Sequence, residues 1–232
     1  MINIEEFTGK AENYAKGRPG YPEAAIEYIC SLVPQNAVFA DIGAGTGKFT
    51  VKLAEHGYSI FAVEPNADMR GQLAVTLATF PDVKIINGTA EKIELNEHSV
   101  DVITVAHALH WFEPEAFRAE CRRIIKPGGL VIAIYNLIAN AAPDQTMVAE
   151  SKKAVEAFFT NPAVSEFPNP LEYTRETWLA YMCTMNDIPL PGETGYDDYI
   201  ASINEGFDRN SSDGILQFDK VTKIYSERIG LK

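Results

Sequence analysis

A glycine-rich segment carries the residues best suited to bind a ligand. It follows an apolar run at residues 38–40, precedes a helix-like stretch, and reads Asp41-Ile42-Gly43-Ala44-Gly45-Thr46-Gly47. A strand, a tight turn and a helix start are therefore expected. The first turn of a helix offers unpaired backbone N–H groups and a partial positive charge, and glycines without a Cβ let a ligand approach the main chain. The segment predicts a ligand-binding loop.

The spacing of the glycines separates this loop from two common phosphate-binding motifs. A dinucleotide-binding motif needs its third glycine three positions after the second, but the residue three positions after Gly45 is Lys48. A P-loop needs Ser or Thr after its lysine, but Phe49 follows Lys48. The acidic Asp41, two residues before the first glycine, would repel a phosphate and suits a cationic ligand.

S-adenosylmethionine meets this requirement, because it carries an ammonium and a sulfonium group as well as a carboxylate, and no phosphate. Residues 38–47 resemble the first motif of the class I S-adenosylmethionine-dependent methyltransferases, and segments up to residue 137 match that family in the same order. The resemblance implies an α/β fold with a doubly wound, mostly parallel seven-stranded sheet. It also implies S-adenosyl-L-methionine as the cofactor and S-adenosyl-L-homocysteine as the product.

The residues expected to contact the cofactor follow the ends of successive strands. Glu64 ends the apolar stretch 60–63, where a carboxylate can accept hydrogen bonds from both ribose hydroxyls. The segment 87–91 ends the third expected strand, where the family turns toward the adenine, although Thr89 stands where many relatives carry Asp. The resemblance implies cofactor contacts from Tyr14, Arg18, Asp41, Gly43, Ala44, Gly45, Gly47, Glu64, Pro65, Met69, Ala90, Glu91 and Ala106.

Two histidines follow the fourth expected strand, where relatives bring the acceptor and the methyl group together. Methyl transfer from a sulfonium is an in-line displacement, with the reacting atoms roughly 3–3.5 Å apart. A hydroxyl acceptor benefits from a general base, whereas a carboxylate is already ionised near neutral pH. His107 and His110 are therefore the candidate catalytic residues; the alternative for His110 is a structural hydrogen bond beside Trp111. With only Glu113 nearby, no metal site is expected.

A second, narrower resemblance involves both ends of the chain. Tyr14, Arg18-Pro19, Tyr21-Pro22, the segment 110–112 and the segment 173–178 together resemble the trans-aconitate-methyltransferase-like group. Members of that group methylate various small molecules, including carboxylates, so the resemblance implies a small-molecule acceptor methylated at a carboxylate or hydroxyl oxygen. It also implies an N-terminal helical lid over the cofactor, with Arg18 near an anionic group. A simple helix-packing anchor is the alternative for this segment.

Composition narrows the class of partner. Lys and Arg number 20 against 32 Asp and Glu, a formal net charge of -12, so neither nucleic acid nor a membrane is an expected partner. Cys30, Cys121 and Cys183 lack Cys-x-x-Cys spacing, which argues against a disulfide framework. The first ten residues lack the pattern of a secretory signal. We expect a cytoplasmic protein, monomeric or weakly dimeric.

Apolar strands alternate along the chain with amphipathic helices, as in a doubly wound sheet. The helices are expected near residues 22–33, 48–56, 67–78, 114–124 and 145–160. After residue 160, prolines break the chain into shorter pieces, which predicts a helical insertion beside the site before a strand-like end at 216–228. One domain over residues 1–232 is expected, with a lid and helix at 1–35, a cofactor-binding core at 36–140, and acceptor-side helices and final strands at 141–232.

Two other classes of protein stay open. An NAD-dependent oxidoreductase would share the fold and the acid after the second strand, although the glycine spacing counts against it. A catalytically silent protein would bind S-adenosylmethionine and transfer nothing. Binding of NAD would favour the first alternative, and binding of S-adenosylmethionine without turnover would favour the second.

Overall fold

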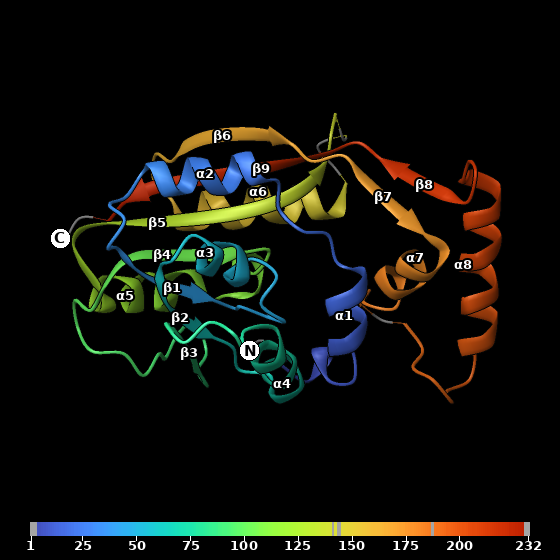
Figure 1. Ribbon diagram of the computed structural model, residues 1–232, viewed down its shortest axis with the longest axis horizontal. Coiled ribbons are helices and arrows are strands. Elements are labelled where there is room, and N and C mark those ends of the chain that lie inside the picture. Colours follow the sequence, from blue (N-terminus) through green and yellow to red (C-terminus); the bar gives the residue numbers. More distant parts are fainter. Residues whose placement is uncertain (1–3, 141, 143–144, 187, 230–232) are drawn as a thin grey trace.

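The computed structural model describes residues 4–140, 142, 145–186 and 188–229. Parts of two expected segments lie outside the described residues. They are residues 1–3 of the segment 1–35 and residues 141, 143, 144, 187 and 230–232 of the segment 141–232. Figure 1 shows one large sheet between helices, and a smaller unit beside one end of the sheet.

Seven strands form the large sheet, in the order β3-β2-β1-β4-β5-β9-β6. Their bounds are β1 (Val38–Ile42), β2 (Ser59–Val63), β3 (Val83–Ile86), β4 (Val100–Ala106), β5 (Ile125–Ile138), β6 (Ala163–Pro168) and β9 (Lys220–Arg228). Strands β1 to β5 are parallel, and β9 is antiparallel to both β5 and β6. The strand order reverses between β1 and β4, which opens a crevice at their carboxyl ends. The expected doubly wound, mostly parallel seven-stranded sheet is confirmed.

Helices cover both faces of the sheet because its strands are buried on both faces. One face packs against α2 (Glu23–Ser31), α3 (Thr50–Glu55) and α4 (Ala67–Thr76), and the other against α5 (Pro114–Ile124) and α6 (Thr146–Phe158). Phe117, Cys121 and Ile124 form the buried stripe of α5, as their spacing predicts. These five helices lie within a few residues of their predicted bounds. In the described part of the chain, no helix has the length and apolar character needed to cross a bilayer.

A separate unit, here called the cap, consists of β7 (Leu171–Thr174), α7 (Arg175–Met182), α8 (Tyr196–Asn210) and β8 (Ile215–Phe218). Strands β7 and β8 form an antiparallel pair that follows β6 and precedes β9 along the chain, after short breaks. Two strands alone have marginal stability in water, and here they gain an apolar cluster with the two helices. That cluster has Tyr173, Phe207 and Leu216 at its centre, with Leu171, Trp178, Tyr181 and Phe218 around them.

The proline-rich stretch after residue 160 contains two strands that the sequence pattern did not predict. Helices were expected before the final strand, and α7 and α8 lie there, but β6 and β7 precede them. Strand β6 is the edge of the sheet, so its side chains are mostly exposed and give little apolar alternation. Pro168 closes this edge strand, a position where a missing N–H costs little.

The N-terminal segment joins the core to the cap. It contains a 3₁₀ turn, η1 (Ile4–Phe7), and α1 (Ala11–Gly17), which packs against α7 (Figure 1). A Cβ on Gly17 would overlap the backbone nitrogen of Tyr181, so glycine is needed for this approach. Lys10 donates a hydrogen bond to the carbonyl of Met185 at 2.8 Å. The segment is therefore anchored on the cap side.

We predict that Gly17→Ala lowers the free energy of unfolding by about 1–3 kcal/mol, because the added methyl group meets a backbone that must shift. Gly71→Ala is the matched control, since that glycine lies inside α4 with open space around its Cβ direction, and the change should stabilise by about 0.5–1 kcal/mol. Denaturant unfolding measures both. Equal stability of Gly17→Ala and the wild type would contradict the close packing of α1 on α7.

Candidate active site

A cavity of about 1200 Å³ lies where the carboxyl ends of β1, β2, β4 and β5 face α1 and the cap. Its walls come from segments far apart in the sequence, which the sheet brings together at one edge. Of the predicted site residues, the cavity is lined by Tyr14, Arg18, Gly43, Ala44, Gly45, Glu64, Pro65, Met69, Ala90, Ala106, His107 and His110. Asp41, Gly47 and Glu91 are not part of its lining.

The glycine loop turns beneath the cavity as expected. Gly43 has a φ of 71°, and a Cβ there would lie 2.7 Å from the Cβ of Ala108. A side chain at this position would therefore be strained and would displace the segment after β4. The N–H groups of Gly43 and Ala44 both donate to the carbonyl of Val63, which ties the loop to the end of β2.

Glu64 is fixed at the cavity wall by the glycine loop. One carboxylate oxygen accepts from the N–H of Gly45 at 2.8 Å, and the other accepts from the N–H of Asn66 at 2.9 Å. Burial raises the pKa of Glu64, and these two backbone hydrogen bonds act in the opposite direction. Each oxygen has a second lone pair, so the carboxylate can still accept hydrogen bonds from a ligand.

Asp41 corrects one expectation from the sequence. Its carboxylate is 1% exposed, outside the cavity lining, and accepts from the hydroxyls of Thr50 at 2.6 Å and Thr104 at 2.9 Å. Asp41 therefore links β1 to β4 and to α3 beneath the glycine loop. Burial raises its pKa to about 6, against the effect of the two threonine hydrogen bonds. Its charge can act on the cavity only from a distance.

Gly47 and Glu91 also differ from the expected direct contacts. Gly47 has a φ of 88°, and a Cβ there would lie 2.8 Å from Cδ1 of Leu73, so this glycine serves the packing of α4 beside the loop. Glu91 accepts a hydrogen bond from the N–H of Glu113 at 3.2 Å. That bond links the loop after β3 to the start of α5.

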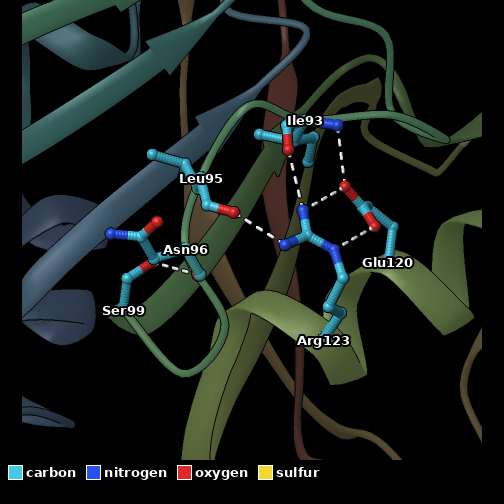
Figure 2. A network of polar contacts seen from close by, with 6 residues as sticks. All are labelled: Ile93, Leu95, Asn96, Ser99, Glu120 and Arg123. Atoms are coloured by element: carbon cyan, nitrogen blue, oxygen red, sulfur yellow. Dashed lines mark hydrogen bonds and ion pairs between the residues drawn. The ribbon is translucent and has the colours of Figure 1, made fainter.

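Figure 2 shows an ion pair on α5, between Glu120 and Arg123, in contact with the loop after β3. Ala90, which precedes these contacts in the same loop, lines the cavity. Arg123 donates to the carbonyls of Leu95 at 2.6 Å and Ile93 at 2.7 Å. Glu120 accepts from the N–H of Ile93 at 2.7 Å. Arg123 also bonds Glu120 and lowers its pKa. The pair therefore supports this wall of the cavity from outside.

His107 is held in one protonation state by the main chain. Its φ is 56°, an uncommon conformation for a residue with a side chain, and its Nε2 lies 2.6 Å from the backbone nitrogen of Asn136. That nitrogen can only donate, so Nε2 accepts and the ring proton lies on Nδ1. Burial, and then the charges of Arg18, His110 and Lys220, lower the pKa of His107 to about 3. The Nδ1–H group is therefore the polar group of this ring that remains available to donate a hydrogen bond.

His110 lies in a 3₁₀ turn after β4, η2 (Leu109–Trp111), and keeps an unpaired ring nitrogen. Its Nδ1 is buried and has no hydrogen-bond partner among the described residues. Its ring lies against Trp111, with 5.2 Å between centroids, and Tyr135, with 6.0 Å. Burial, and then the charge of Arg18, lower its pKa to about 4. The ring is thus neutral at neutral pH and available to a ligand.

Arg18 has no anionic partner among the residues that the structure describes. Its Nη2 donates to the hydroxyl of Tyr14 at 3.3 Å and to the carbonyl of Thr184 at 3.2 Å. Its Nε is buried and unpaired in the described structure, and its Cζ lies 4.7 Å from the ring centroid of Tyr14 and 5.3 Å from that of Tyr181. Because buried polar groups are normally satisfied, Arg18 has the properties of an anion-binding residue.

Asn136, near the end of β5, joins four other segments around the cavity. Its side chain donates to the carbonyl of Gly20 at 3.1 Å and accepts from Thr222 at 2.6 Å and Asn169 at 3.1 Å. Its N–H donates to His107. The loop after Arg18, the ends of β5, β6 and β9, and the segment after β4 therefore share one polar cluster.

The sequence did not reveal several other lining residues. Asn66 precedes α4 and accepts from the N–H of Met69 at 3.0 Å, and an Asn before a predicted helix is a recognisable N-cap signal. Its Nδ2 donates to the carbonyl of Ile4 and to the hydroxyl of Thr8, which ties the N-terminal turn to α4. Asn136 and Lys220 lie in strands, and no local pattern distinguishes them.

The order of the strands and the helices on both faces form the Rossmann-like fold that solved methyltransferase structures share. Residues 40–133 match a family described as a methyltransferase domain. An uncharacterized methyltransferase of Mycobacterium bovis is 39% identical over 123 residues, which cover 53% of this chain and 49% of the relative. The chain therefore spans about half the length of this curated relative.

Solved structures of methyltransferases share the fold of this chain. A candidate type II methyltransferase from Anaeromyxobacter dehalogenans has a TM-score of 0.66 at 22% identity, over 92% of this chain and 98% of that one. A phosphoethanolamine N-methyltransferase of Haemonchus contortus, in complex with phosphomonomethylethanolamine and S-adenosylhomocysteine, has a TM-score of 0.57 at 12% identity, over 99% and 60%. Residues 40–133 of this chain are thus similar to a methyltransferase domain, and S-adenosylmethionine is the cofactor that this similarity implies.

The buried carboxylate of Asp41 predicts a pH dependence of stability. Its folded-state pKa is about 6, above the unfolded value, so the folded chain binds more protons between the two values and loses stability as pH rises through this window. We expect the stability of the wild type relative to Asp41→Asn to fall by roughly 2–3 kcal/mol between about pH 4 and pH 6. Denaturant unfolding across this range measures the difference. Asp82→Asn, at an exposed position, is the control and should show no such trend.

Proposed function

We propose that this chain is a methyltransferase that uses S-adenosylmethionine and transfers the methyl group to an oxygen of a small-molecule acceptor. The observation that carries the proposal is the position of Glu64, whose carboxylate is held by the glycine loop in the wall of the cavity. The same cavity is lined by His107 and His110. The carboxylate predicted to bind the ribose and the histidines predicted at the site of methyl transfer therefore line the same cavity.

The residues of the cavity fit S-adenosylmethionine on three independent grounds. Glu64 offers free lone pairs to the ribose hydroxyls. No heavy atom lies within 4 Å of the place that a Cβ on Gly45 would take, so a ligand can approach the glycine loop there. The buried, unpaired Nε of Arg18 suits the carboxylate of the methionyl part. When bound, S-adenosylmethionine supplies an electrophilic methyl group.

The other predicted contacts keep supporting roles in this proposal. Tyr14 contacts Arg18 through its ring and its hydroxyl. Pro65 and Met69 would line the ribose and adenine side with Ala90. Ala44, within the glycine loop, and Ala106, at the end of β4, would also line the bound cofactor. Asp41 would act through its charge, and Gly47 and Glu91 through the shape of the loops that carry the contacts.

The histidines favour an acceptor oxygen that is already ionised. An efficient general base has a pKa near the working pH, whereas the pKa values of His107 and His110 are lowered to about 3 and about 4. Neither ring is basic enough to take the proton of an ordinary hydroxyl. A carboxylate needs only orientation, which the Nδ1–H of His107 and the ring of His110 can provide. This agrees with the resemblance to the trans-aconitate-methyltransferase-like group.

The cap and α1 would exclude water from the reacting groups. Both contribute residues to the cavity, and α1 packs directly on α7. Exclusion of water strengthens hydrogen bonds and ion pairs to the ligand and prevents side reactions. The volume is large for a single small ligand, since typical ligand pockets range from about 300 to 1,000 Å³. A cytoplasmic location and a monomeric or weakly dimeric state stay predictions.

Isothermal titration calorimetry with S-adenosylmethionine, S-adenosylhomocysteine and NAD tests the cofactor. We expect binding of the first two only, and Glu64→Ala should weaken it by about 1.5–3 kcal/mol, because hydrogen bonds to a charged group are lost. Glu94→Ala, at an exposed position outside the lining, is the control. Binding of NAD alone would support an oxidoreductase. Undiminished affinity in Glu64→Ala would remove Glu64 from the site.

We predict that His110→Ala lowers kcat/KM about three- to ten-fold, the effect of one lost hydrogen bond, with little change in cofactor affinity. The acceptor would come from a screen of carboxylic acids for S-adenosylhomocysteine formation. Because both histidines are neutral above about pH 5, kcat/KM should show no histidine inflection between pH 6 and 8. His56→Ala, which breaks a pair with Glu23 far from the cavity, is the control. A loss of about 10²–10⁴ would instead indicate a general base.

A further inference from the structure

Two cations at the cavity share one aromatic ring. The Cζ of Arg18 lies 5.3 Å from the ring centroid of Tyr181, and the Nζ of Lys220 lies 5.1 Å from it. All three side chains line the cavity. Neither cation takes part in any ion pair of the described residues, although the chain has a net charge of -12. Among the described residues, therefore, no carboxylate forms an ion pair with Arg18 or Lys220, although the chain has more acidic than basic residues.

The backbone of Lys220 is fixed, whereas its ammonium group is free to bind a ligand. Lys220 begins β9, is paired in register with Ile138, and its carbonyl accepts from the N–H of Asn169 at 2.8 Å. Side chains two positions apart share one face of a strand, so Lys220 lies on the face of Thr222, which bonds Asn136. Asn136 and Ile138 both line the cavity. The strand therefore directs this lysine to the acceptor side.

A third donor lies close to this cation pair. The contact with Asn136 leaves the Nδ1–H of His107 as the remaining polar group of that ring. Arg18, Lys220 and His107 all line the same cavity, and the charges of both cations contribute to the lowered pKa of His107. Such a group of donors without an acid attracts anions.

Part of the cavity lining is apolar. It includes the side chains of Phe7, Leu109, Trp111, Leu137, Met147 and Val148. A ligand that fills this space must therefore combine an apolar body with at least one anionic group. Small polar molecules would leave much of this surface without contacts.

We propose that Lys220 binds an anionic group of the methyl acceptor, a carboxylate or a phosphate, and that the acceptor is an amphipathic organic anion. The proposal rests on the proposed methyltransferase function, because it assigns Arg18 to the carboxylate of the cofactor. Arg18 would then bind the carboxylate of the cofactor, and Lys220 would bind the anionic group of the acceptor. The anion at Lys220 serves as an anchor and orients the rest of the acceptor toward the methyl group.

The test measures ligand binding by isothermal titration calorimetry on the full chain saturated with S-adenosylhomocysteine. The probes are matched pairs of acid and amide, 3-phenylpropionate with 3-phenylpropanamide and octanoate with octanamide, together with phenyl phosphate. We expect the wild type to prefer acid over amide by about ten-fold, the effect of one hydrogen bond to a charged group. Lys220→Met should abolish the preference, and Lys220→Arg should retain it.

Lys153→Met is the matched control, because Lys153 also lines the cavity but is exposed on α6. It should keep both the preference and the affinity for S-adenosylhomocysteine. Lys220→Met should change that affinity by no more than about two-fold. A preserved Tm, together with the behaviour of Lys220→Arg, separates loss of the subsite from loss of the fold.

Three results would overturn the proposal. The wild type could show no preference for acids, whether or not the probes bind. Lys220→Met could weaken S-adenosylhomocysteine strongly, which would assign Lys220 to the cofactor. Lys153→Met could lose the preference to the same extent. Failure of the wild type to bind S-adenosylhomocysteine counts against the proposed function instead, and the acid and amide comparison on the ligand-free protein then decides the subsite.

Discussion

The cavity depends on the hydrogen bonds of one buried amide, Asn136. Its side chain holds the carbonyl of Gly20, two residues after Arg18, and its main chain fixes the tautomer of His107. Thr222 and Asn169 complete the cluster from β9 and the end of β6. Because a buried amide is stable only when its donors and acceptors are paired, these segments must arrive together. The walls on the cofactor side and on the acceptor side therefore form as one unit.

Much of the fold follows from local sequence patterns. The glycine loop, the strand before Glu64 and the stripe of α5 depend on periodicity and turn chemistry, and all three lie where the sequence indicates. The edge strand β6 could not be predicted in this way, because an exposed edge strand needs no alternation of apolar and polar residues. Local patterns reveal elements whose burial is regular, and they reveal little about elements that complete a sheet through partners distant in the chain.

The site shows the same division between local and distant determinants. The place of Glu64 in the cavity wall was predictable because Glu64 follows the end of β2, beside the glycine loop. The place of Asp41 outside the lining was not predictable, because its position beside the loop does not reveal the two threonine hydroxyls that bind its carboxylate. Lys220 was missed because the ring it contacts lies about forty residues earlier in the chain, a separation that no motif spans.

The cap enters and leaves the sheet at a single point. Asn169 and Lys220, which flank it in the sequence, are joined by a 2.8 Å backbone hydrogen bond. An inserted segment whose ends are adjacent in space can be replaced by another of different length without disturbing its host. Evolution could thus exchange residues 170–219 as a module, and altered acceptor choice would arise on an unchanged cofactor-binding core. The same junction offers protein engineers a natural place for chimeras.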